Sequence, residues 1–105
     1  MRVAIFSILF CGVTGSAIDQ SWSELIASME KMHVAMASVA PSGKSDVDFV
    51  RLMIPHHQAA IDMAKTQLLY GKDPQVRRLA QEIITDQQSE IELMNLWLKQ
   101  HKLEH

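Results

Sequence analysis

Cysteine, proline and glycine are scarce in this chain. Its 105 residues include one Cys, three Pro and four Gly. A single cysteine excludes an intrachain disulfide framework and a zinc site built from cysteine alone. So few prolines and glycines argue against a turn-rich β fold. The formal charge of −2 excludes the basic surface typical of nucleic-acid-binding proteins, so no nucleic acid is expected as a partner.

Apolar side chains, by contrast, are abundant. Hydrophobic residues make up 48% of the chain, and seven of them are methionines. This composition can form the core of one domain and is not that of a disordered chain. We therefore expect an all-α protein with a single domain.

The two ends of the chain are expected to lie outside that domain. Residues 1–17 have the order of a signal peptide, because Arg2 precedes an apolar run that ends in the small residues Gly15-Ser16-Ala17. The run is shorter than the roughly 20 apolar residues that span a bilayer, so no membrane span is expected after signal removal. Residues 103–105 are interpreted as the remnant of an expression tag. The helical bundle domain is therefore expected over 18–102, in a periplasmic or secreted protein.

Hydrophobic periodicity predicts three long helices, over about 21–40, 46–70 and 74–100. The second contains Pro55, which removes one backbone hydrogen bond and is expected to kink the helix. Because only a few residues join the second and third helices, the two must be antiparallel neighbours. The first helix is expected to cover the apolar face that they leave.

Each predicted helix begins with a capping signal. Ser21 and Glu24 form a capping-box pattern for the first helix. Ser45 is the expected N-cap of the second. Asp73 followed by Pro74 is typical of an N-cap and the first helical position of the third.

The antiparallel pair also has a predicted register. If the connection between the two helices is centred near residue 72, the numbers of two facing residues should sum to about 144, within one helical turn either way. Met53 is then expected near Ile91, and His56 and His57 near Gln87.

Methionine and histidine are the residues that could carry chemistry. At about 100° per residue, their side chains share the inward faces of the predicted helices. The candidate metal ligands are Met29, Met32, His33 and Met36 of the first helix, Met53, His56, His57 and Met63 of the second, and Met94 of the third. Gln87 and Glu90 interrupt the apolar face of the third helix.

Taken singly, each inward methionine is explained by core packing. Two adjacent histidines on an apolar face are costly to bury without partners, however. Thioether and imidazole together suit a soft metal, namely Cu(I), or Ag(I) by analogy. We therefore expect a copper ion, Cu(I), as the cofactor, not required for folding. Gln87 and Glu90 are expected to orient the imidazoles from behind.

Other functions are less well supported by the residues. No nucleophile motif or phosphate-binding loop is present, so the chain is not expected to be an enzyme. Glu30 and His33 form one Glu-x-x-His motif, whereas di-iron bundles use two. The main alternative is a bundle without metal that binds a protein partner through a Met-rich groove. Converging sulfur and imidazole atoms would favour metal, and methionines splayed over an open face would favour a partner.

The segment from Asp48 to Ala64, with Met53-Ile54-Pro55-His56-His57 at its centre, resembles the signature of a known family. Further likeness extends through Glu90 and Met94 to Leu98. The family is that of CopM-like secreted bacterial ferritin-like helical bundles, described as domain of unknown function number three hundred and five.

The resemblance implies a ferritin-like, up-down antiparallel bundle that is exported and binds copper or silver ions. By motif position it implies five ligands: Met53, His56, His57, Met63 and Met94. A four-helix bundle is implied where this chain offers three helices. The fourth position is expected to be filled by the N-terminal segment or by a partner, either a homodimer mate or a copper-handling protein.

Overall fold

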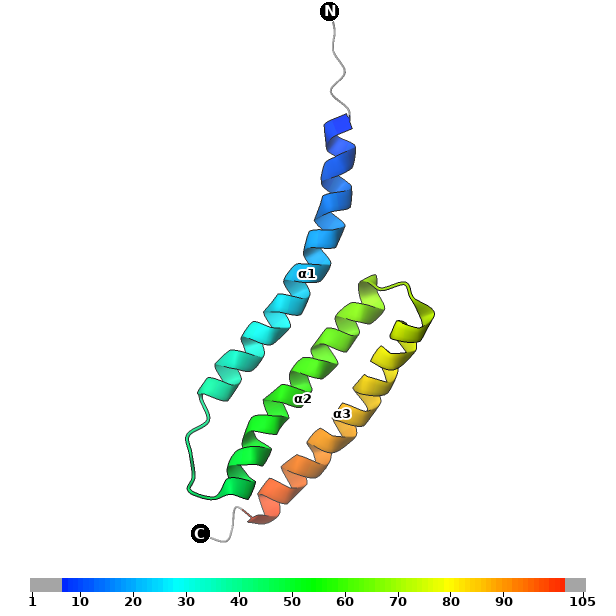
Figure 1. Ribbon diagram of the computed structural model, residues 1–105. Helices are drawn as coiled ribbons and strands as arrows, with labels where there is room; N and C mark the ends of the chain where they lie inside the picture. Colours follow the sequence, from blue (N-terminus) through cyan, green and yellow to red (C-terminus); the bar gives the residue numbers. More distant parts are fainter. Residues whose placement is uncertain (1–6, 102–105) are drawn as a thin grey trace, which may run out of the picture.

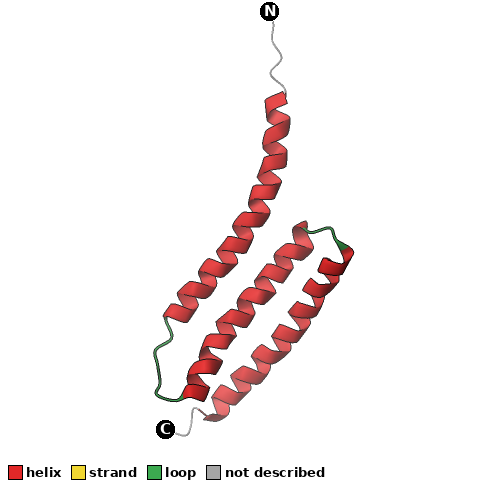
Figure 2. Cartoon of the chain, viewed as in Figure 1, coloured by secondary structure: helices red, strands yellow, loops and turns green. Residues whose placement is uncertain are grey.

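The computed structural model describes residues 7–101, with side chains from Gln20 onward. Within this part the chain forms three helices and no strand (Figures 1 and 2). They are α1 (Ser7–Ala37), α2 (Ser45–Tyr70) and α3 (Pro74–His101). The expected all-α class with three long helices is confirmed. The start of the predicted signal peptide (1–6) and the predicted tag remnant (103–105) lie outside the described residues.

Helix α1 begins well before the predicted start. It is continuous from Ser7, so Ser21 lies inside the helix and is not an N-cap. No proline interrupts this stretch, and the apolar residues before Ser21 continue the helix. The segment therefore extends α1 beyond α2 and α3 (Figure 1) and does not return beside them as a fourth helix. Among the described residues, none of the helices has the length and apolar content needed to cross a membrane.

The loop between α1 and α2 is fixed by Asp48. Its Oδ1 accepts a hydrogen bond from the backbone N–H of Ser42 at 2.9 Å. Hydrogen bonding by the Ser42 side chain, and next by its backbone N–H, lowers the pKa of Asp48, with a smaller contribution from the charge of Arg51. The N-cap of α2 is Lys44 and not the predicted Ser45, and the Lys44 side chain makes no capping bond.

The turn between α2 and α3 matches its prediction. The N–H groups of Gln75 and Val76 both donate to Oδ1 of Asp73 at 3.0 Å, which makes Asp73 the N-cap of α3. Gly71 ends α2, and a Cβ at this position would collide with the side-chain amide of Gln67. Arg77 Nη1 donates to the carbonyls of Leu68 and Gly71 at 2.7 and 3.0 Å, and so satisfies backbone groups left open by the end of α2.

The three helices form an open layer with α2 in the middle (Figure 1). Helix α2 packs against both α1 and α3, whereas no packing of α1 on α3 is found over the described residues. The described chain is flat, with a smallest principal extent of 15 Å against 29 Å for the next. The expectation that α1 covers the apolar face of α2 and α3 is therefore wrong, because α1 lies beside α2 in the same layer.

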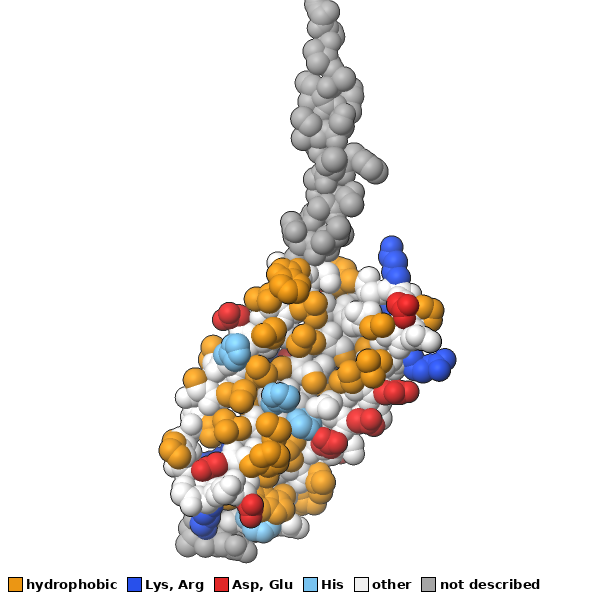
Figure 3. Space-filling model, viewed as in Figure 1, with side chains coloured by type: hydrophobic (Ala, Val, Ile, Leu, Met, Phe, Trp, Pro, Cys, Tyr) orange, Lys and Arg blue, Asp and Glu red, His pale blue; other side chains and the backbone are white. Residues whose placement is uncertain are grey.

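One side of this layer is rich in methionine, histidine and exposed apolar residues. Helix periodicity places His56 about 180° around α2 from the exposed Lys65, on the opposite side of the layer. We call the side that carries His56 the Met/His face. It comprises Trp22, Met29, His33 and Met36 of α1, Phe49, Met53, His56 and Met63 of α2, and Val76, Leu79, Leu93 and Met94 of α3. Figure 3 shows this gathering of hydrophobic and histidine side chains on one surface.

The core of the layer is small. Its buried hydrophobic residues are Ala59, Ile61 and Ala64 of α2 and Ala80 of α3. Among the described residues, no side chain is less than 2% exposed. The hydrophobic residues predicted to fill an interior therefore lie in large part on an open surface.

Candidate metal centre

His57 and Glu90 join α2 to α3 at the middle of the layer. Nε2 of His57 lies 2.6 Å from Oε1 of Glu90. The His57 side chain is 15% exposed, whereas that of Glu90 is 57% exposed. The carboxylate therefore reaches the imidazole from the solvent side, in the position expected of a residue that orients it. The pair also agrees with the predicted register, to within one turn.

The other nitrogen of His57 has no partner. Nδ1 is buried and forms no hydrogen bond. A carboxylate is an acceptor, so the Nε2 that it binds carries the proton, and in the neutral ring Nδ1 holds a lone pair. A buried polar atom without a partner costs free energy and calls for an explanation. A metal ion bound to the lone pair would be one.

The register of α2 and α3 brings two methionines to the same level. Met53 precedes His57 by one helical turn on α2, and Met94 follows Glu90 by one turn on α3. Because the helices are antiparallel, the register that pairs His57 with Glu90 also sets Met53 opposite Met94. Both methionines are half-buried. An imidazole nitrogen and two thioethers are thus brought to one seam, between α2 and α3.

His56 points in a different direction from His57. It is exposed, and the two ring centroids lie 6.1 Å apart with the planes tilted by 57°. Adjacent helical residues differ by about 100° in direction, so His57 faces α3 and His56 lies on the Met/His face. The sequence reasoning treated the two as one pair, but the fold gives them different surroundings.

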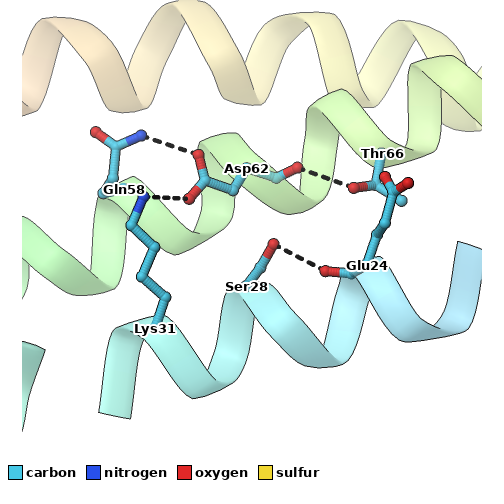
Figure 4. A network of polar contacts seen from close by, with 6 residues as sticks. All are labelled: Glu24, Ser28, Lys31, Gln58, Asp62 and Thr66. Carbon is cyan, nitrogen blue, oxygen red and sulfur yellow. Dashed lines mark hydrogen bonds and ion pairs between the residues drawn. The ribbon is translucent and has the colours of Figure 1, made fainter. Parts of the chain in front are cut away.

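The seam between α1 and α2 carries a network of polar contacts (Figure 4). Lys31 and Asp62 form an ion pair at 4.0 Å across it, and Gln58 donates to the same Asp62 at 3.0 Å. The buried hydroxyls of Ser28 and Thr66 donate to carbonyls of their own helices. Polar side chains are therefore part of this contact, beside the apolar Met32, Ala35 and Ala59.

The predicted buried stripe of α1 is rotated. Ser28 is buried at the contact and Met32 lines it, whereas Met29 and His33 are exposed. Their position follows from the single layer, because α1 has only one neighbour and buries only a narrow strip. The prediction assumed that the most apolar face would be the packed one.

The nine predicted ligands consequently do not form one cluster. Helix α2 separates the α1 residues from Met94, since α1 and α3 make no contact. Met53, His57 and Met94 belong to the α2–α3 seam. Within the described residues, Gln87 forms no hydrogen bond with either neighbouring histidine, whereas Glu90 does. Nor do three His, Cys, Asp or Glu side chains of that part gather where they could hold a metal, so a zinc or di-iron type of centre is not assembled there.

Two features of this region were missed by the sequence reasoning. Phe49 and Leu79, both large and hydrophobic, are well exposed on the Met/His face. Tyr70 donates to Oε2 of Glu24 at 2.8 Å and so joins the end of α2 to α1. The packing of α1 on α2 through small residues could not be predicted, because small residues give no strong hydrophobic pattern in the sequence.

Comparison with known proteins gives two matches. The family model described as "Domain of unknown function (DUF305)" matches residues 13–98. "Uncharacterized protein L153" of Acanthamoeba polyphaga mimivirus is 43% identical to this chain over 60 residues. That match covers 57% of this chain and 40% of the viral protein, so the chain spans less than half of the relative's length.

Proposed function

The chain belongs to the DUF305 family, and we propose that within it the chain has a CopM-like role. It would be an exported protein that binds Cu(I) or Ag(I) through methionine and histidine, for metal buffering, resistance or delivery. Its helices would then represent part of a ferritin-like bundle. The signal-like segment at residues 1–17 supports export to the periplasm or the medium.

The free Nδ1 of His57 is the observation that carries this proposal. It is buried and without a partner, while Nε2 is held by Glu90. Histidines that bind metals commonly donate their other ring N–H to a carboxylate, which fixes the ring and makes the free nitrogen more basic. His57 and Glu90 already have this arrangement, so a metal ion could bind Nδ1 without any change in their hydrogen bond.

Met53 and Met94 suit the same ion. Thioethers are soft, uncharged ligands that favour Cu(I) over hard divalent ions. They also remain available in an oxidising compartment, where thiols form disulfides. We assign Nδ1 of His57 and the sulfur atoms of Met53 and Met94 as the ligands of the proposed site, with Glu90 orienting the imidazole.

A titration of the chain with Cu(I) tests the proposal, under reducing conditions and against a chromophoric chelator. We expect the chain to withdraw copper from the chelator, and the double variant His56→Ala/His57→Ala to lose at least tenfold in affinity. His101→Ala is the matched control, because His101 stacks on Trp97 at the end of α3, away from the seam. Equal affinity of the double variant and the native chain would refute the assignment of His57 as a ligand.

A second candidate function is supported by the exposure of the Met/His face. Methionines spread over an open apolar surface are typical of proteins that bind partners through an adaptable groove. This function requires no metal. It predicts that the chain leaves the copper with the chelator and associates with a protein through this face.

A further inference from the structure

We propose that a second copy of this chain covers the Met/His face, so that the methionine-bearing sides of two layers meet. The inference deepens the proposed function and rests on it in one respect only, that the second copy would enclose the proposed metal site. The association itself follows from the exposed face of the single layer and does not require the metal.

The three described helices form a single layer, whereas a stable helical domain needs a second layer packed on the first. A helix with an apolar stripe must bury it against another element, and stable domains are built from at least two packed layers. Here α1 and α3 contact only α2, and all three helices lie side by side. Among the helices that the structure describes, none lies over the Met/His side of α2.

Within residues 7–101, all three helices already belong to the layer, so none of them is left to cover the Met/His face.

The exposed area is of the size that a dimer buries. Trp22 is 65% exposed and Phe49 61% exposed. At roughly 150–250 Å² per aromatic side chain, these two alone leave on the order of 250 Å² in water. Val76, Leu79 and Leu93 add to the same side, each more than two-fifths exposed. Together with the half-buried methionines they approach the roughly 800 Å² that each partner contributes to a stable interface.

The distribution of charge fits a second copy. Hydrophobic and histidine side chains occupy the centre of the face, and Lys, Arg, Asp and Glu lie mainly toward its rim (Figure 3). An apolar centre with a polar rim is the usual anatomy of a protein interface. A two-fold contact places the same patch on both sides, and a centre of little net charge can meet its own copy without repulsion.

Sedimentation of the metal-free chain tests this inference. Over a range of about 1 to 100 µM we expect a dimer whose fraction rises with concentration. Leu79→Asp places a charge on the Met/His face and should raise the dissociation constant at least tenfold. Leu69→Asp is the matched control, since Leu69 is 68% exposed on the opposite side of the layer and its variant should dimerise as the native chain does.

Circular dichroism establishes that each variant is folded. If Leu79→Asp loses its helical signal, the milder Leu79→Ala replaces it and should still weaken the dimer several-fold. A native chain that stays monomeric at the highest concentration overturns the inference. Equal weakening by Leu69→Asp and Leu79→Asp overturns it as well.

The failure of this inference can be told apart from that of the proposed function. The sedimentation experiment contains no metal, and the copper titration does not depend on the oligomeric state. A monomer that takes copper from the chelator overturns the dimer alone. A dimer that leaves copper with the chelator overturns the metal function alone.

Discussion

Glu90 holds the imidazole of His57 by Nε2, at 2.6 Å, and thereby leaves Nδ1 as the free nitrogen. The two residues are 33 positions apart, and their meeting depends on the antiparallel register of α2 and α3. The contact fixes the orientation of the ring, and the same register sets Met53 and Met94 at one level.

Replacing Glu90 by Gln should weaken Cu(I) binding by about 10- to 100-fold, because the imidazole loses its charged partner and becomes a poorer donor. Stability should change little, since the Glu90 side chain is 57% exposed. A competition titration measures the affinity. Glu92→Gln is the control, on the same helix and exposed, and it should bind like the native chain. If both variants bind equally well, Glu90 has no role in holding His57 for the metal.

Replacing Met53 or Met94 by Leu removes the sulfur and keeps the volume. Each change should therefore lower Cu(I) affinity by at least about tenfold, while unfolding free energy changes by less than about 1.5 kcal/mol. Met29→Leu serves as the control, because Met29 lies on α1, across α2 from Met94. Copper titration and urea unfolding of the metal-free variants measure the two effects. An affinity loss in Met29→Leu that equals the others would place the ion elsewhere on the face.

Tyr70 should titrate above its ordinary range. Its O–H donates to the Glu24 carboxylate, and this bond, with burial and the charge of Glu24, raises the pKa of Tyr70 above 10.0. Because the pKa is raised on folding, the stabilisation is present at lower pH and is lost as pH rises through the folded value. The chain has a single tyrosine, so its absorbance reports this residue alone. Glu24→Ala should return the titration toward 10, and an unchanged curve would contradict the contact.

Arg77 should stabilise the turn between α2 and α3. Its guanidinium donates to the carbonyls of Leu68 and Gly71, and the group is half-buried. Arg77→Ala should cost about 1–2 kcal/mol of unfolding free energy, since hydrogen bonds to charged groups are worth more than neutral ones. Arg78→Ala is exposed and should cost less than about 0.5 kcal/mol. Urea unfolding compares them, and equal losses would show that the carbonyl contacts of Arg77 contribute nothing.

Local chemistry was readable from the sequence alone. The three helices, the Asp73 cap and the end of α2 at Gly71 follow from propensity and from hydrogen bonds between near neighbours, which need no distant partner. The level of His57 relative to α3 also followed, because the short turn at Asp73 leaves the two helices little choice of register. The methionine and histidine candidates were visible for the same reason, as a matter of helical periodicity.

Only the tertiary structure decided where those faces go. Periodicity identifies an apolar side of a helix but does not say what covers it, and α1 could have packed over α2 and α3 or beside α2. It lies beside α2, where Ser28 and Ala59 permit close approach of the two helices. That choice exposes Met29 and His33, separates the candidates of α1 from Met94, and leaves His57 Nδ1 buried without a partner. Packing depends on the fit of several helices at once, which no single stretch of sequence contains.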